Sequence, residues 1–130
     1  MEYGSSENLA MVYETLTNIA RAITTLQERT ASVSSADDFI SSPQGMEKLD
    51  AACMVIMAIG ESIKNLDKLT NKELMPTYPE LDWRGLMGVR DIIAHRYFQI
   101  DAEAVFNILK EDIPSLGKAI SCFLNDLFPD

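Results

Sequence analysis

The chain has 130 residues, of which 47% are hydrophobic and 24% are charged, and its formal net charge is −9. This length suits one domain with one core over residues 1–130, and the composition is that of a folded globular protein. The acidic excess argues against a protein that coats nucleic acid non-specifically, but it leaves room for a small basic site on an acidic body. With one histidine and no cysteine–histidine spacing, the sequence predicts no metal site.

The sequence shows no sign of a membrane span or of export. No apolar run approaches the roughly 20 residues that a span needs, and the first residues lack the basic start of a secretion signal. We therefore expect a cytoplasmic protein with no membrane partner. Cys53 and Cys122 each lie in an apolar helical pattern, which favours two buried free thiols over a disulfide.

The first half of the chain is patterned as two long helices. Apolar residues from Leu9 to Leu26 recur at intervals of three and four, which predicts a helix that a polar residue at its start caps. A short turn over residues 37–42 leads to a second helix, whose apolar core stripe is expected to begin at Met46 and end at Leu69; its middle is apolar nearly all round. Gly60 there costs about 1 kcal/mol relative to alanine, so we expect another helix to pass close by.

The second half is patterned as shorter helices. Residues 70–82 hold two prolines and no period, which predicts the main loop. Asp82 is placed to cap a helix that runs to about His95, and Asp101 to cap a fourth segment. Near Pro114 a fifth segment begins or the fourth kinks. The predicted fold is all-α: an antiparallel four-helix bundle with an additional short helix.

A cationic window lies between residues 84 and 97. It holds three arginines, one aspartate and the only histidine, His95, and so carries +2 on a chain of net −9. Arginine suits phosphate because its planar fork binds two oxygens. The alternative is a solvated surface on which the arginines pair with carboxylates, with His95 favourably placed at the end of a helix. For Glu61 two roles stay open: a carboxylate in an apolar helix more often pairs with an arginine, here Arg84 or Arg90, than takes part in the chemistry.

The spacing of two residues in this window bears on its chemistry. Arg90 and His95 are five residues apart, about 140° around an ideal helix. They converge more easily if the helix ends near His95 or if two chains build the site. Cleavage of RNA through its 2′-hydroxyl needs both a base and an acid. A two-fold dimer would place two imidazoles and two guanidiniums in one cleft.

Residues 90–97 read Arg-Asp-Ile-Ile-Ala-His-Arg-Tyr, which matches the pattern R-x4-H-x-Y. The segments at residues 59–61, 83–90 and 113–116 also match segments of one protein family, in the same order along the chain. In these features the chain resembles the HepT-like toxins of the HEPN superfamily over roughly residues 6–127.

The resemblance implies a dimeric HEPN bundle whose two motifs face each other in a metal-independent endoribonuclease site without a cofactor. It also implies a minimal nucleotidyltransferase antitoxin that neutralises the toxin by AMPylation of Tyr97. By position, Arg90 would hold the scissile phosphate and His95 would act as general acid or base. Asp91 and Arg96 would support them. Asp91 stands where many relatives have asparagine, which adds negative charge beside the phosphate.

Two other functions fit the same residues. The chain could be a non-catalytic helical subunit that binds a nucleotidyltransferase and presents substrate to it. It could also be a structural bundle whose motif forms a polar interface network. Tyr97 alone is equally typical of a half-buried ring with a surface hydroxyl, and we assign Trp83 to packing. Seven methionines favour an exposed apolar seam and hence a homodimer, although methionine also fills cores.

Overall fold

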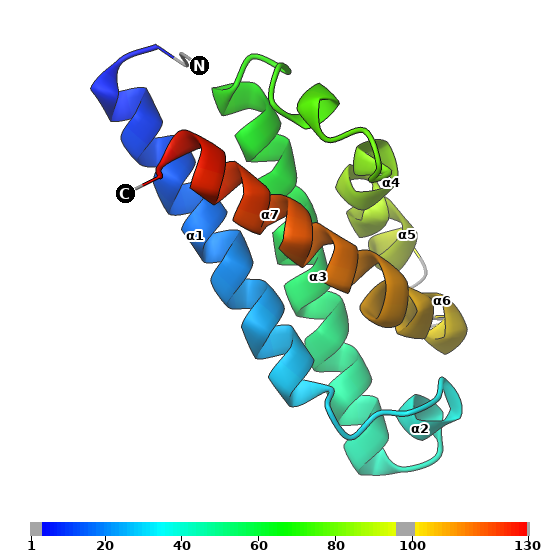
Figure 1. The fold of residues 1–130 in the computed structure, drawn as a ribbon. Helices are drawn as coiled ribbons and strands as arrows, with labels where there is room; N and C mark the ends of the chain where they lie inside the picture. Colours follow the sequence, from blue (N-terminus) through cyan, green and yellow to red (C-terminus); the bar gives the residue numbers. More distant parts are fainter. Residues whose placement is uncertain (1–3, 96–100, 130) are drawn as a thin grey trace.

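A computed structural model describes residues 4–95 and 101–129, and this part of the chain is all-α (Figure 1). The elements are α1 (Ser6–Arg29), α2 (Asp37–Ile40), α3 (Pro43–Leu69), the 3-10 turn η1 (Met75–Thr77), α4 (Trp83–Met87), α5 (Val89–His95), α6 (Ala102–Asn107), the π-helical turn η3 (Ile108–Asp112) and α7 (Ile113–Leu127). The predicted fold class is confirmed. None of the helices among these residues is both long enough and apolar enough to cross a membrane.

The two long helices α1 and α3 run antiparallel and form the centre of the bundle (Figure 1). The side chain of Ser5 accepts the N–H of Asn8 at 3.2 Å and starts α1. Ser42 accepts the N–H of Gly45 at 3.0 Å and starts α3. The predicted apolar stripe of α1 is confirmed as its buried face, which consists of Val12, Leu16, Ile19, Ile23 and Leu26.

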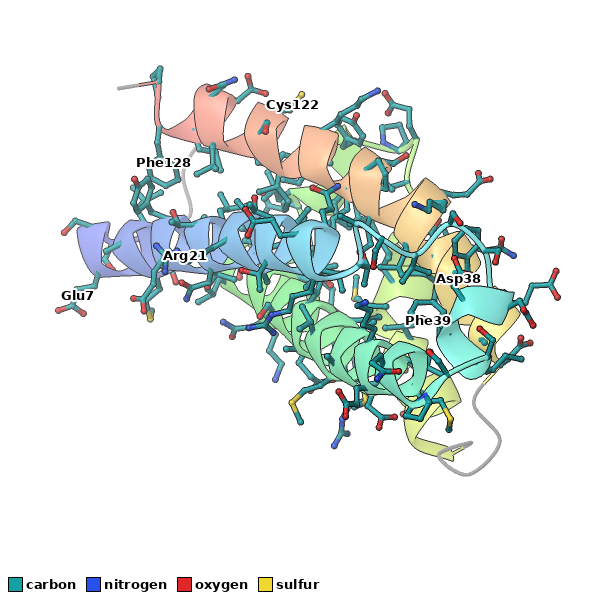
Figure 2. All side chains as sticks on the ribbon, turned by 90° about the horizontal axis from the view of Figure 1, so that it is seen from below. Glu7, Arg21, Asp38, Phe39, Cys122 and Phe128 are labelled. Carbon is teal, nitrogen blue, oxygen red and sulfur yellow. The ribbon has the colours of Figure 1, made fainter. Side chains whose placement is uncertain are left out.

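The connection between these helices holds a short helix where the sequence indicated only a turn. Phe39 of α2 is fully buried, and Figure 2 shows it directed toward the other helices. A Cβ on Gly45 would collide with the carbonyl oxygen of Asp38, so α2 lies directly on α3. The N–H and hydroxyl of Ser34 donate to the Asp38 carboxylate at 2.8 and 2.9 Å. These bonds favour the charged form and lower the pKa of Asp38.

Residues 83–95 form two helices where the sequence predicted one. The N–H of Gly88 donates to the carbonyl of Arg84 at 3.0 Å and ends α4, and the N–H of Asp91 donates to the carbonyl of Gly88 at 3.1 Å. This bond spans three residues instead of four, so the chain tightens at Gly88 and separates α5 from α4. The expectation of a close neighbour at Gly60 is confirmed: a Cβ there would lie 2.9 Å from the carbonyl oxygen of Leu86.

The chain stays helical from α6 into α7 through the π-helical turn. Asp101 caps α6 as predicted, accepting the N–H groups of Glu103 and Ala104 at 3.0 and 3.1 Å. Pro114 lies in the first turn of α7. Because proline has no N–H and its ring crowds the carbonyl four residues earlier, an unbroken α-helix is unfavourable at this position. The sequence left open whether a helix begins or kinks near Pro114. Both occur: α7 begins at Ile113, and the π-helical turn before it interrupts the α-helical path without ending the helix.

The loop over residues 70–82 is pinned to the bundle by Trp83. The indole N–H of Trp83 donates to the carbonyl of Tyr78 at 2.8 Å. Its ring stacks on Phe123 of α7, with centroids 5.8 Å apart. Within the loop, Leu74 and Met75 are buried. The assignment of Trp83 to packing is confirmed.

Two predicted core positions are wrong. Met46 is 53% exposed, because it lies in the first turn of α3 on the side away from the core. Cys122 is exposed on the outer side of α7 (Figure 2), while its neighbour Phe123 points inward. Cys53 is buried as predicted, and both thiols are free. Burial, together with the charge of Asp50, raises the pKa of Cys53 to about 11.

Candidate functional site

Helix α5 carries the first half of the motif and is anchored on α3. Val89 and Ile93, four residues apart and therefore on one face of the helix, are both buried. A Cβ on Gly60 would come within 3.1 Å of Cγ1 of Val89, so this face lies against α3. Arg90 and Asp91 occupy the other side and are exposed to solvent. The packing of α5 thus presents Arg90 at the surface.

His95 is the last residue of α5. The condition that the helix ends near His95 concerns residues 96–100, which lie outside the described part of the chain, so it stays a prediction. The side chain of His95 lies outside the described part of the structure, and so do Arg96 and Tyr97 as whole residues. The roles predicted for these residues, and for Arg90 and Asp91, stay predictions.

Glu61 pairs with neither of its two candidate arginines. Its carboxylate accepts from Nζ of Lys64 at 3.1 Å, one turn along the same helix. Gly60 faces α4 and α5, and the next residue projects about 100° further around the helix. Glu61 therefore lines a groove between α3 and α1, together with Met11 and other residues.

Two cations of the window, Arg84 and Arg90, have no ion-pair partner in the described part of the chain. Arg84 and Arg90 are exposed, and neither forms an ion pair with a described residue. This observation argues against the alternative in which the two arginines are held by surface carboxylates. The arginines of α4 and α5 thus remain able to receive an anion.

Two further results concern what else the site could hold. Among residues 4–95 and 101–129, no group of three or more histidine, cysteine, aspartate or glutamate side chains is arranged to hold a metal ion. A cavity beside Arg84 was not predicted from the sequence. Part of its lining comes from the loop over residues 70–82, whose sequence has no period and thus gives no signal of a common surface.

Comparison with known proteins identifies the class. The chain matches the family model described as "Ribonuclease HepT-like" over residues 19–123. The match covers most of the chain, including the whole of α3, α4 and α5. The protein belongs to the HepT-like ribonuclease family.

Individual relatives agree with this assignment. The chain is 32% identical over 101 residues to "Probable ribonuclease HepT" of Thermococcus cleftensis, covering 78% of this chain and 84% of the relative. It is 33% identical over 66 residues to MJ1380 of Methanocaldococcus jannaschii, named as an inferred RNase, covering 51% of this chain and 60% of the relative. MJ0127 of the same organism, also named as an inferred RNase, is 26% identical over 118 residues, or 91% of this chain and 88% of the relative. No solved structure matches the chain significantly.

Proposed function

We propose that the protein is a metal-independent endoribonuclease toxin whose site forms between two copies of the chain. Membership of the HepT-like ribonuclease family and the names of the relatives support ribonuclease as the class of enzyme. The observation that carries the proposal is the position of Arg90, exposed and unpaired among the described residues, on a helix that is fixed on α3 and that also carries His95, the one histidine of the sequence.

The chemistry begins at the 2′-hydroxyl of the RNA. One imidazole, from His95 of one chain, removes the hydroxyl proton, and the 2′-oxygen attacks the adjacent phosphorus. The bond from phosphorus to the 5′-oxygen breaks, and the imidazolium of the second copy gives its proton to that oxygen. The products are a 2′,3′-cyclic phosphate and a 5′-hydroxyl end. Arg90 stabilises the negative charge that the phosphate accumulates in the transition state.

The single histidine of each chain favours a homodimer. Each chain supplies one histidine, whereas the reaction uses an acid and a base at the same time. A two-fold axis beside α5 brings both copies of His95 into one cleft. Exposed methionines on α1 and α3, at positions 11, 46 and 54, are consistent with an interface. Dilution to monomer abolishes activity under this proposal, and cleavage by a verified monomer would contradict it.

Regulation of the site follows the family pattern in this proposal. A minimal nucleotidyltransferase antitoxin transfers AMP to the hydroxyl of Tyr97, with release of pyrophosphate from ATP. The new phosphodiester adds negative charge two residues beyond His95, where it occupies the cations that RNA needs. Tyr97→Phe is expected to cleave RNA normally and to accept no AMP when such a transferase and ATP are added. Mass spectrometry detects the adduct, and AMP on the Phe variant would disprove the assignment.

The decisive test is cleavage of a mixed RNA pool in EDTA. Wild-type protein is expected to cleave, and His95→Ala to show no activity because it loses both the acid and the base. Arg90→Ala is expected to fall by about 100-fold or more, the usual effect of removing one donor to a developing oxyanion. Arg21→Ala is the matched control, because Arg21 is an exposed arginine on α1, outside the window.

Each outcome of this test separates two functions. Cleavage that persists in His95→Ala rejects the site. If neither wild type nor variant cleaves, although the protein is dimeric and unmodified at Tyr97, the non-catalytic subunit that presents substrate to a nucleotidyltransferase becomes the better explanation.

A further inference from the structure

A cavity of about 450 Å³ opens where the end of α3, the loop over residues 70–82 and α4 meet. This volume is within the range of small-molecule sites, about 300–1,000 Å³. Its walls are mostly apolar and consist of Met75, Pro76, Pro79, Trp83 and Met87. Polar groups are few, as in sites where apolar walls hold a ligand and a few charges orient it.

The walls of this cavity are held in place by hydrogen bonds. The hydroxyl of Thr70, a fully buried residue, donates to the carbonyl of Leu66 at 2.9 Å and ends α3. Lys72 follows in the left-handed conformation, with φ of 62°, and its N–H donates to the carbonyl of Asp67 at 2.8 Å. On the other side, the bond from Trp83 to Tyr78 fixes the loop against α4. The cavity is therefore formed before any ligand arrives, which lowers the entropic cost of binding.

The charges of the lining favour an anion. Lys72 and Arg84 contribute two positive charges, against the single carboxylate of Asp67. Two other cavities among the described residues have the opposite character. The groove between α1 and α3 has Glu14 and Glu61 in its lining, and the cavity between α4 and η3 has Asp82 and Asp112, and neither lining includes a cation. On a chain of net charge −9, the two cations of this lining thus favour an anionic ligand over a cationic one.

We propose that this cavity is a nucleotide subsite of the enzyme: it binds one nucleotide of the RNA substrate outside the scissile position. The base lies against the apolar wall, and its phosphate contacts the guanidinium of Arg84 and the ammonium of Lys72. The Asp67 carboxylate accepts a hydrogen bond from a ribose hydroxyl or from an amino group of the base.

The position of the cavity relative to the motif supports one continuous RNA strand. Arg84 of α4 and Arg90 of α5 are six residues apart, so their Cα atoms lie at most about 20 Å from each other, and both side chains are exposed. A single strand a few nucleotides long can therefore contact both arginines. This inference rests on the proposed ribonuclease function, because it assigns the cavity to that substrate.

Trp83 provides a direct readout, because it is the only tryptophan of the chain and lines the cavity. The probes are an eight-nucleotide 2′-O-methyl RNA, which cannot be cleaved through its 2′-oxygen, and AMP, which represents a free nucleotide. The oligonucleotide is expected to change the fluorescence of Trp83 in wild-type protein at lower concentration than AMP does. AMP that binds as tightly as the oligonucleotide would overturn the assignment to RNA.

Two variants test the cation contacts. Arg84→Gln and Lys72→Asn are each expected to weaken oligonucleotide binding by about tenfold, the effect of losing one charge-assisted hydrogen bond. Asparagine at position 72 tolerates the left-handed backbone, so this change leaves the turn intact. Lys118→Gln is the control, because Lys118 is an exposed lysine of α7 that lies outside the cavity lining. Circular dichroism verifies that each variant is folded.

The cavity and the ribonuclease proposal can fail separately. If the wild type cleaves RNA but the oligonucleotide leaves Trp83 fluorescence unchanged, or if Arg84→Gln binds as tightly as wild type, the cavity assignment is overturned and the ribonuclease proposal stands. If the oligonucleotide binds and Arg84→Gln weakens it in a protein that never cleaves, the cavity is supported as a nucleotide site and the ribonuclease proposal is contradicted.

Discussion

Replacing Gly60 by alanine tests how α5 is held on α3. Alanine in a helix interior gains about 1 kcal/mol over glycine. The added Cβ would meet the carbonyl oxygen of Leu86 at 2.9 Å and Cγ1 of Val89 at 3.1 Å. The first of these is backbone, which cannot rotate away, and overpacking of this kind costs about 1–3 kcal/mol. We therefore predict that Gly60→Ala lowers the free energy of unfolding, by up to about 2 kcal/mol.

Gly117 of α7 is the matched control. A Cβ there would lie 3.9 Å from Cγ2 of Ile23, an ordinary van der Waals distance. Gly117→Ala should therefore keep the full helix gain of about 1 kcal/mol. Urea unfolding at one protein concentration measures both variants, since self-association adds to apparent stability. If Gly60→Ala proves as stabilising as Gly117→Ala, the close approach of α4 and α5 to α3 is wrong.

The same change should reach the site. To relieve the contact, the α4–α5 junction must move by a few tenths of an ångström, and Arg90 moves with it. Because catalysis depends on sub-ångström placement, Gly60→Ala is expected to cleave RNA more slowly than Gly117→Ala, even where both are fully folded. Equal rates for the two variants would show that the position of α5 is not set by this contact.

Three further predictions concern stability and reactivity. Burial, together with neighbouring carboxylates, raises the pKa of Asp112 above 3.8, so its ionised form opposes folding at neutral pH and this cost vanishes below the unfolded pKa. Asp112→Asn should raise the urea midpoint at pH 7 and leave it nearly unchanged at pH 3; an equal rise at both would contradict this. Iodoacetamide at pH 8 should alkylate the exposed Cys122 and spare Cys53, whose pKa is about 11, as mass spectrometry of the intact protein would show. Asp101→Ala removes the cap of α6 and should cost about 1 kcal/mol, measurable by urea unfolding, whereas Asp101→Asn should cost less.

The helices were predictable wherever one face of the pattern was clearly polar. In α1 the apolar spacing identified the buried face correctly, and Gly60 in α3 indicated the close neighbour that α4 and α5 provide. Both signals are local. The first is the period of the apolar residues in α1, and the second is a glycine in a helix interior, whose unfavourable free energy indicates a close neighbour.

The wrong predictions concern helices in which the apolar pattern does not show which side faces solvent. Helix α3 is apolar nearly all round, so the sequence could not tell that Met46 faces solvent or that Glu61 turns toward α1 instead of the arginines. At Cys122 the buried Phe123 made an exposed neighbour look like core. For residues 83–95 the sequence predicted one continuous helix, and only the structure shows that the chain tightens at Gly88.

The candidate site was predictable in part for a similar reason. The exposure of Arg90 follows from the buried residues on the opposite face of α5, which the period of the sequence reveals. The cavity beside Arg84 could not be predicted, because it joins residues from α3, α4 and a loop without a period. Contacts between distant segments of this kind depend on tertiary packing, which propensity and spacing do not encode.

The π-helical turn at Ile108–Asp112 sets the rotational phase of α7. A π-helical turn accommodates one more residue than an α-helical turn. The extra residue is absorbed within one turn, so the helix that follows keeps its orientation relative to α6. If the same residues were purely α-helical, the extra residue would rotate α7 by about 100°, and the face that carries Leu116, Ile120 and Phe123 would turn away from the core. Deletion of one residue within Ile108–Asp112 is therefore tolerated as a change from a π-helical to an α-helical turn, whereas an insertion is not.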